Sequence, residues 1–255
     1  MGTRHWNLVL QSNQPNKNLK FARANHFVLG YNRKLGESLR IKVEPYFQYL
    51  YNVPVIPDST ESMLNFAQNW LINEQYVNEG TGRNYGVDLT LEKFLSNNFY
   101  YLLTTSIYNA QYAGKDRIYH NSRFNRNYVF NALCGKEFYL GRDKENVLGI
   151  NFRFSYKGGD RTYFVNMEQS ELSESIIYDY SRPFERRFPD IWTTDLTLTY
   201  RKNKPKYSSE WALQFKNIIA SKDNYDDYFN TKENKVVLEE GQKIPVPSIS
   251  YKIEF

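Results

Sequence analysis

Eight charged side chains, most of them at alternate positions of short segments, are the residues of this sequence best suited to ionic chemistry. In LRIKVE, residues 39–44, every second residue is charged. Alternate side chains of an extended strand point to the same face, so these charges are expected to share one surface. There they could line a path for a substrate or form a hydrated polar wall. The eight residues are Arg40, Lys42, Glu44, Asp88, Glu92, Arg153, Asp195 and Arg201.

Common catalytic and cofactor motifs are missing from the sequence. It contains no Gly-x-Ser-x-Gly, no His-Glu-x-x-His and no phosphate-binding loop. The single cysteine, Cys134, has no intramolecular disulfide partner, and its context ALCGKEF favours a small strand residue over a nucleophile. His5, His26 and His120 lack the spacing of metal ligands. We therefore expect no enzyme, cofactor or metal site, although a site assembled from distant strands is an alternative.

Two polar segments contain further charged residues. The segment 221–234, SKDNYDDYFNTKEN, has acidic residues at Asp223 and Asp227 but lacks the central glycine and terminal glutamate of a calcium loop. We interpret it as a mobile surface loop. Residues 158–187 are too many and too polar for a connection inside a compact domain, which predicts an exposed, ligand-handling loop. The arginines there that could meet lipopolysaccharide or an acidic ligand are Arg161, Arg182, Arg186 and Arg187.

The composition is typical of strands that are buried on one face. Tyr and Phe contribute 22 and 17 residues, yet the charged fraction is 24%, and the mean hydropathy is -0.68. This combination favours half-buried strands over helices packed in a core. No apolar run reaches the roughly 18 residues of a membrane helix, but transmembrane strands leave little trace in average hydropathy. The net charge of +5 is spread without a basic run, so no nucleic-acid partner is expected.

Alternation of apolar and polar residues predicts an antiparallel sheet of ten strands. Between residues 39 and 51, every odd position is apolar or aromatic. Residues 98–108 and 127–140 fit less well because both faces are partly apolar. The predicted strands span about residues 4–11, 22–34, 38–52, 82–95, 98–112, 126–140, 146–157, 190–202, 206–219 and 246–255.

Short and long connections alternate between these strands, so all short ones should lie at one end of the sheet. That asymmetry is typical of outer-membrane barrels, which have short periplasmic turns and long extracellular loops. We therefore predict an all-β fold, with residues 1–255 forming a single antiparallel, up-and-down transmembrane β-barrel segment. Aromatic residues near strand ends suggest interfacial girdles, although aromatics favour strands generally. They are Tyr46, Tyr49, Tyr51, Tyr108, Tyr112, Trp192, Tyr200, Trp211 and Tyr251.

Several segments resemble the C-terminal barrel of TonB-dependent receptors, in the form common in Bacteroidota. They are HFVLGYNRKLGESLRIKVEPYFQYLYNVPV, NEGTGRNYGVDLTLEKFLSNNFYYLLTTSIYNAQY, EWALQFKNI and PSISYKIEF. The resemblance implies an outer-membrane receptor for a metal chelate, vitamin or glycan, energised by the TonB complex. Members of this family close about 22 strands around an N-terminal plug. We therefore expect this chain to supply barrel wall and extracellular loops, without the plug through which the TonB complex would be contacted.

The final strand, PSISYKIEF, carries a second feature of that resemblance. Ile249, Tyr251, Ile253 and Phe255 alternate with polar residues and end on an aromatic residue. This pattern is similar to the C-terminal signal recognised by the barrel-assembly machinery, although an ordinary final strand is the simpler alternative. The other expected partners are the lipid bilayer and lipopolysaccharide.

Two other classes of protein fit the alternation. One is an autonomous small outer-membrane barrel that acts as an enzyme or adhesin, because an even strand number permits closure. The other is a soluble antiparallel protein in which the apolar stripe at residues 39–51 is buried against another sheet.

Overall fold

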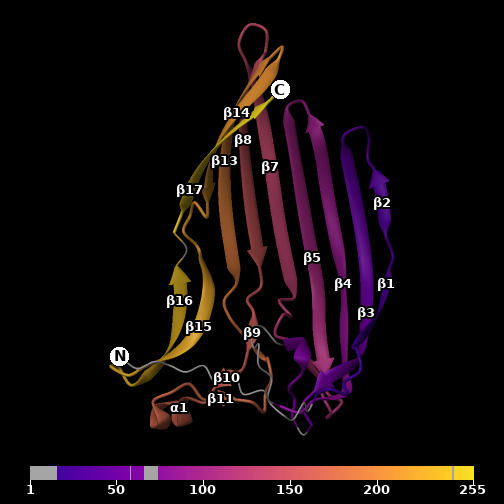
Figure 1. Ribbon diagram of the computed structural model, residues 1–255, viewed down its shortest axis with the longest axis vertical. Helices are drawn as coiled ribbons and strands as arrows, with labels where there is room; N and C mark the ends of the chain where they lie inside the picture. Colours follow the sequence, from indigo (N-terminus) through magenta and orange to yellow (C-terminus); the bar gives the residue numbers. More distant parts are fainter. Residues whose placement is uncertain (1–15, 58, 66–73, 243) are drawn as a thin grey trace.

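The chain folds into a tall, curved, mostly antiparallel sheet with irregular structure gathered at one end (Figure 1). The computed structural model describes residues 16–57, 59–65, 74–242 and 244–255. The predicted all-β class is confirmed for these residues. No closed barrel is formed by them, because the large sheet ends at separate edges.

The large sheet has 11 strands, and its main path runs β1-β3-β4-β5-β7-β8-β13-β14-β17. β2 pairs with β3 beside β1, and β6 pairs with the end of β5. Long strands that follow one another in the chain are neighbours in the sheet, as an up-and-down topology requires. Their bounds are β1 Arg23–Val28, β2 Tyr31–Lys34, β3 Leu39–Val55, β4 Val77–Ser96, β5 Phe99–Ala113, β6 Tyr119–Asn121, β7 Tyr128–Leu140, β8 Asn146–Lys157, β13 Ile191–Lys204, β14 Tyr207–Lys216 and β17 Val246–Glu254.

Nine of the ten predicted strands are confirmed, and the strand predicted at 4–11 lies outside the described residues. β1 and β2 together make the predicted strand 22–34, interrupted at Leu29 and Gly30.

The long connections contain small elements that the sequence did not predict. They are η1 Met63–Asn65, β9 Arg161–Thr162, β10 Phe164–Val165, α1 Met167–Ser173, β11 Tyr178–Asp179, β12 Arg186–Arg187, β15 Lys222–Asn230 and β16 Lys235–Gln242. β15 and β16 pair along their length. The interpretation of 221–234 as a mobile surface loop is corrected in its secondary structure, because most of the segment lies in strand β15 of this hairpin.

Short and long connections lie at opposite ends of the sheet, as predicted. The short-turn end holds the connections at 35–38, 97–98, 141–145 and 205–206. The C-terminus of the chain lies at the same end (Figure 1). Asn97 and Asn98 both have positive φ, 53° and 61°, which suits a two-residue hairpin turn. The loop end holds the connections at 56–76, 114–127, 158–190 and 217–245.

Register keeps residues of one kind on one face across neighbouring strands. Val43 pairs with Leu89, Ile41 pairs with Leu91, and Leu91 pairs with Leu103. We call the face of Val43 and Leu89 the apolar face. Glu44 pairs with Asp88, and this side is the polar face. Every pairing in the large sheet is antiparallel, and the registers shift only near the strand ends, between Leu50 and Val55 of β3 and between Lys93 and Ser96 of β4. The two faces therefore extend across the sheet between these irregularities.

The apolar face is not covered by another layer of the described chain. Leu89 is 41% exposed, Ile107 59% and Ile249 70%. None of the stripe from residue 39 to residue 51 is buried, so the soluble alternative, which needs that burial, has no support within this chain. The fully buried side chains Val53, Val55, Tyr112, Asn125, Pro183 and Ser170 instead belong to the loop end and the strand ends beside it.

Tyrosine rings lie over glycines on the polar face. The Tyr46 hydroxyl lies beside Gly86, where an added Cβ would be 2.9 Å from that oxygen and 2.5 Å from the Ile107 carbonyl oxygen. Tyr100 lies in the same way over Gly135, its pairing partner. Tyr46 is therefore part of the polar face, and it cannot belong to an aromatic row on the apolar face.

Replacing Gly86 with alanine is expected to destabilise the sheet by about 1–3 kcal/mol, because the methyl group has to displace Tyr46 or the β5 backbone. The measurement is the free energy of unfolding by denaturant in one fixed detergent. Gly30→Ala is the matched control, since its added Cβ would meet only the Glu44 carboxylate at 3.7 Å. Equal losses in the two variants would contradict the packing role of Gly86.

Candidate functional site

All eight predicted charged residues lie on the polar face. Arg40 pairs in register with Glu92, Glu44 with Asp88 and Arg153 with Asp195. Lys42 lies between Arg40 and Glu44, and Arg201 follows Asp195 at an even spacing on β13. Register therefore brings these charges together in two groups, one on β3 and β4 and one on β8 and β13, whose paired members are 42 to 52 positions apart in the chain.

On β3 and β4, two ion pairs and one hydrogen bond partner the charges of the polar face. Arg40 forms an ion pair with Glu92. Lys42 Nζ lies 2.6 Å from the Glu44 carboxylate. Asp88 accepts a 2.6 Å hydrogen bond from the Ser106 hydroxyl of β5. These contacts leave each carboxylate with a donor.

The same arrangement continues on β7, β8 and β13. Arg153 Nε lies 3.2 Å from Asp195, whose side chain is 13% exposed. Arg201 lies 3.8 Å from Glu137 of β7. The Asp195 carboxylate also accepts a 2.9 Å hydrogen bond from the Asn217 backbone, which fixes the turn after β14. The sequence analysis did not include Glu137 among the charged residues of this face. Its position on β7, two residues after Gly135, places it on the polar face.

Opposite charges are nearly balanced over the whole polar face. It carries eight cationic and seven anionic side chains, so no strong field of one sign is built there. The cations are Lys34, Arg40, Lys42, Arg153, Lys157, Arg201, Lys216 and Lys252, and the anions are Glu44, Asp88, Glu92, Glu137, Asp195, Glu210 and Glu254. Selection of a ligand by charge alone is therefore not expected from this face.

The C-terminal residues lie on the apolar side of β17. Ile249 pairs with Leu213, Tyr251 with Trp211 and Ile253 with Ser209. The Trp211 and Tyr251 rings are 4.6 Å apart. Phe255 follows the end of β17 and is 97% exposed. Its expected role as an assembly signal stays a prediction.

Aromatic residues form rows near both ends of the apolar face on the C-terminal half of the sheet. At the loop end, Tyr156 stacks on Tyr128 with centroids 5.7 Å apart and pairs in register with Trp192. At the short-turn end, Trp211 pairs with Tyr200 and Tyr251. Among the residues expected in girdles, Tyr46, Tyr108 and Tyr112 are exceptions, because their register places them on the polar face.

A shared carboxylate ties the loop-end aromatic row together. The Tyr128 and Tyr156 hydroxyls both donate to Asp190 Oδ2, at 2.6 Å and 2.5 Å. Arg187 lies 3.4 Å from the other oxygen of Asp190. Partial burial raises the pKa of Asp190, but the hydrogen bonds from the two tyrosines and the charge of Arg187 outweigh it, so the pKa lies below its usual range.

Arg161, which was expected to meet a ligand, donates hydrogen bonds that join separate loops of this chain. Its Nε donates to the Asn125 carbonyl oxygen at 2.9 Å, and its Nη2 donates to the Asn127 side chain at 2.8 Å. Nη1 also approaches the Phe184 carbonyl oxygen at 3.4 Å. Burial, with a contribution from the charge of Arg187, lowers the pKa of Arg161. Loop-to-loop attachment is therefore its structural role.

The other three arginines of that segment are also engaged within the chain. Arg182 pairs with Glu185 at 3.0 Å and lies over the Phe164 ring. Arg186 pairs with Asp227. Each of these guanidinium groups has a partner within the chain, and their contact with lipopolysaccharide or an acidic ligand stays a prediction. The sequence does not reveal these partners. Asp227 is distant from Arg186 in the chain, and the pairs of Arg182 with Glu185 and of Arg187 with Asp190 follow no motif that the sequence analysis used.

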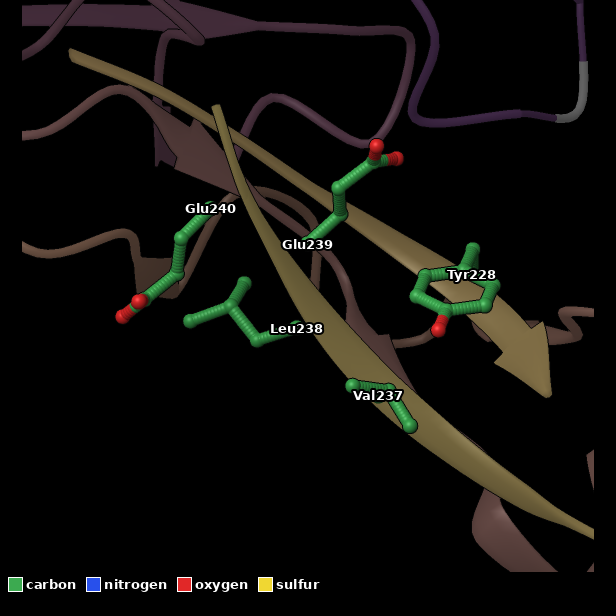
Figure 2. A pocket seen from close by; sticks show the side chains of 5 residues that line it. All are labelled: Tyr228, Val237, Leu238, Glu239 and Glu240. Carbon is green, nitrogen blue, oxygen red and sulfur yellow. The ribbon is translucent and has the colours of Figure 1, made fainter. Parts of the chain in front are cut away.

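A hollow of about 520 Å³ lies against the β15–β16 hairpin. Its lining residues are Tyr228, Val237, Leu238, Glu239 and Glu240. Figure 2 shows the carboxylates of Glu239 and Glu240 pointing to opposite sides of the strand, so they do not converge on one ligand. In the described part of the chain, no group of three or more His, Cys, Asp and Glu residues could hold a metal ion.

Comparison of the sequence with models of known protein families and with curated proteins finds no match. Within the ranges that the structure covers, no helix has the length and apolarity needed to cross a membrane.

The Asp190 cluster predicts a pH dependence at the loop end. Because its pKa is lowered on folding, the stability that Asp190 contributes is present above about pH 4 and is lost as pH falls through the lower folded value. The protection factors of amides at the paired ends of β8 and β13, with the intrinsic pH dependence of exchange divided out, should therefore fall below about pH 4.

Asp190→Asn should remove most of this pH response, because the variant carries no carboxylate to protonate. Asp143→Asn is the control, since Asp143 is exposed in the turn between β7 and β8 and should leave the response intact. An unchanged response in Asp190→Asn would contradict the assignment.

Proposed function

We propose that this chain forms part of the wall and loops of an outer-membrane barrel, and that the barrel is a TonB-dependent receptor for nutrient uptake. The observation that carries the proposal is the continuous, uncovered apolar face of the sheet. Leu89, Ile107 and Ile249 represent three separate strands of that face and are each more than a third exposed. Exposed apolar area on this scale marks an interaction surface, and lipid is the partner that suits a whole sheet face.

The spacing of the aromatic rows supports a bilayer partner. On β13, Trp192 and Tyr200 are eight residues apart on the apolar face, which corresponds to about 26 Å along a strand. A strand tilted by about 40° would then cover about 20 Å of membrane thickness, close to the apolar band of outer-membrane barrels. Between the rows, the apolar positions of β8, β13, β14 and β17 carry no charged residue.

The connections support a direction for the sheet in the membrane. Short turns at one end and long folded loops at the other are the arrangement of outer-membrane barrels. In this proposal the short-turn end faces the periplasm and the loop end faces the outside. Phe255 then lies on the periplasmic side, where the barrel-assembly machinery would contact the final strand, and the loop end meets lipopolysaccharide.

Free strand edges require further strands beside this sheet. The outer edges of β1, β2 and β17 have no strand partner among the described residues. Unpaired backbone groups cost several kcal/mol each in hydrocarbon, so both edges must be paired in a membrane. In a larger receptor, neighbouring strands of the same barrel supply these partners. Pairing of the two edges with each other is the alternative, and it would make a small autonomous barrel.

The transport role rests on the sequence resemblance and is compatible with the polar face. A nearly neutral wall of mutually paired charges leaves ligand choice to the loops and to other parts of the receptor. The ligand class proposed from the resemblance is a metal chelate, vitamin or glycan.

Membrane placement predicts opposite environments for adjacent residues of β4. With Cys134→Ala as background, a nitroxide at residue 87 should collide mainly with oxygen dissolved in lipid. A nitroxide at residue 88 should collide mainly with a water-soluble nickel reagent, because Val87 and Asp88 lie on opposite faces. The test uses the full chain in outer-membrane fractions. Equal accessibility of both labels to both reagents would contradict a lipid-facing surface.

Receptor function predicts dependence on the TonB complex. In the source organism, loss of this gene and loss of the TonB complex should impair growth on the same limiting nutrient. Loss of both should be no worse than loss of the TonB complex alone. Growth that depends on the gene but not on the TonB complex would leave the barrel placement intact and overturn the receptor assignment.

A further inference from the structure

The β15–β16 hairpin stands apart from the large sheet. The two strands form a separate two-stranded sheet. Figure 1 shows the hairpin extending beyond β14 and β17 at the loop end, with its outer part near α1. A two-stranded hairpin is marginally stable by itself in water, so contacts with its neighbours must keep it in place.

One buried ion pair joins the hairpin to the loop that contains β12. Arg186 donates from Nη1 to Asp227 Oδ2 at 2.7 Å and from Nη2 to Asp227 Oδ1 at 2.8 Å. The Asp227 side chain is 2% exposed, and that of Arg186 is 24% exposed. A bidentate arginine–carboxylate pair of this kind is strong and directional. Removing either partner leaves a charge poorly compensated.

An aromatic stack reinforces the same contact. Tyr225, two residues before Asp227, stacks on Phe188, two residues after Arg186, with centroids 6.3 Å apart. The Arg186 guanidinium also lies 5.3 Å from the Phe188 ring centre. Alternate residues of the hairpin therefore meet alternate residues of the loop in one compact contact.

The base of the hairpin is attached differently. Hydrogen bonds join Asn217 and Ser221 across the turn that follows β14. The Asn217 side-chain amide donates to the Ser221 carbonyl oxygen, and the Ser221 hydroxyl donates to Asn217 Oδ1. Asn217 N–H donates to Asp195, so this turn is fixed to β13. The return to β17 passes through Ile244 and Pro245, which belong to no strand. The hairpin thus has a fixed attachment at its base and a charged contact farther along, and in addition β15 lies beside β13 and β16 lies beside α1.

We propose that the β15–β16 hairpin is an arm that swings about its base as one unit, with the Arg186–Asp227 pair as the latch that keeps it closed. Closed, the arm packs against the loop of β12 and α1. Opening exposes Arg186 and Phe188 and allows the Asp227 carboxylate to hydrate. The arm therefore controls access to this part of the loop end. The inference does not depend on a membrane setting, so its failure would leave the receptor proposal untouched.

Distances between two nitroxides test the arm directly. One label replaces Lys232, in the exposed hairpin turn, and the other replaces Glu171 of α1, in the full chain with Cys134→Ala. The protein with an intact latch should give one short distance. Asp227→Asn should add a longer component, because the amide cannot balance the charge of Arg186. An unchanged distance distribution in Asp227→Asn would overturn the proposal.

Two control variants separate the latch from general charge effects. Asp227→Glu keeps a carboxylate and should retain more of the short distance than Asp227→Asn. Glu185→Gln removes the partner of Arg182, an exposed arginine pair in the same loop, and should leave the distance unchanged. Opening of equal size in Glu185→Gln would overturn the assignment of the latch to Arg186 and Asp227.

Amide exchange distinguishes a swinging arm from a hairpin that unfolds. In Asp227→Asn, amides bonded between β15 and β16, around the Tyr228 and Val237 pair, should exchange within about threefold of the unsubstituted protein. Loss of their protection by more than about tenfold, together with the longer distance, would mean local unfolding and would overturn the rigid arm.

Discussion

In-phase pairing of alternating strands is the constraint on which the rest of this structure depends. A shift of one residue in any pairing would move every side chain of a strand to the other face. The pairing of Glu44 with Asp88 and of Arg153 with Asp195 shows that phase is kept at both sides of the sheet. Because phase is kept, one face gathers the ion-paired charges and the other gathers the exposed apolar residues, with Arg33, Lys93 and Lys136 on that apolar face near the short-turn end. Both the proposed lipid contact and the polar wall follow from that separation.

The loop end is stabilised by a different kind of interaction. The large sheet supplies no enclosed core of its own, and the fully buried residues, such as Val53, Tyr112 and Asn125, lie where the loops meet the strand ends. Hydrogen bonds and ion pairs from Arg161 and Arg186 join loops that are far apart in the chain. Each loop is therefore held by its neighbours, which turns long polar segments into a folded surface. A surface that is organised before binding can discriminate among ligands at a lower cost in ordering.

The sheet and the loop end therefore differ in what they present to the surroundings. The polar face presents nearly balanced charges, and the loop end presents a folded surface. Paired charges make the wall hydrated and nearly neutral, which suits passage or contact with a folded polar partner. In the proposed receptor, shape and chemical selectivity would depend on the loops. The β15–β16 hairpin forms a sheet separate from the large one, and the side chains of Asp227 and Tyr225 join it to the loop of β12.

The sequence by itself determined the long strands of the large sheet, their antiparallel order and the face on which most of their charged residues lie. These depend on a period of two residues and on turn residues such as Asn97 and Asn98, which are local properties. Only the tertiary structure decided that Tyr46 lies over Gly86, that Arg186 pairs with Asp227 and that residues 222–242 form a hairpin. These contacts join segments whose partners are set by register and loop packing, and no local pattern encodes which distant residue will be met. Pairing of the edge strands β1, β2 and β17 with further strands would depend on non-local interactions of the same kind.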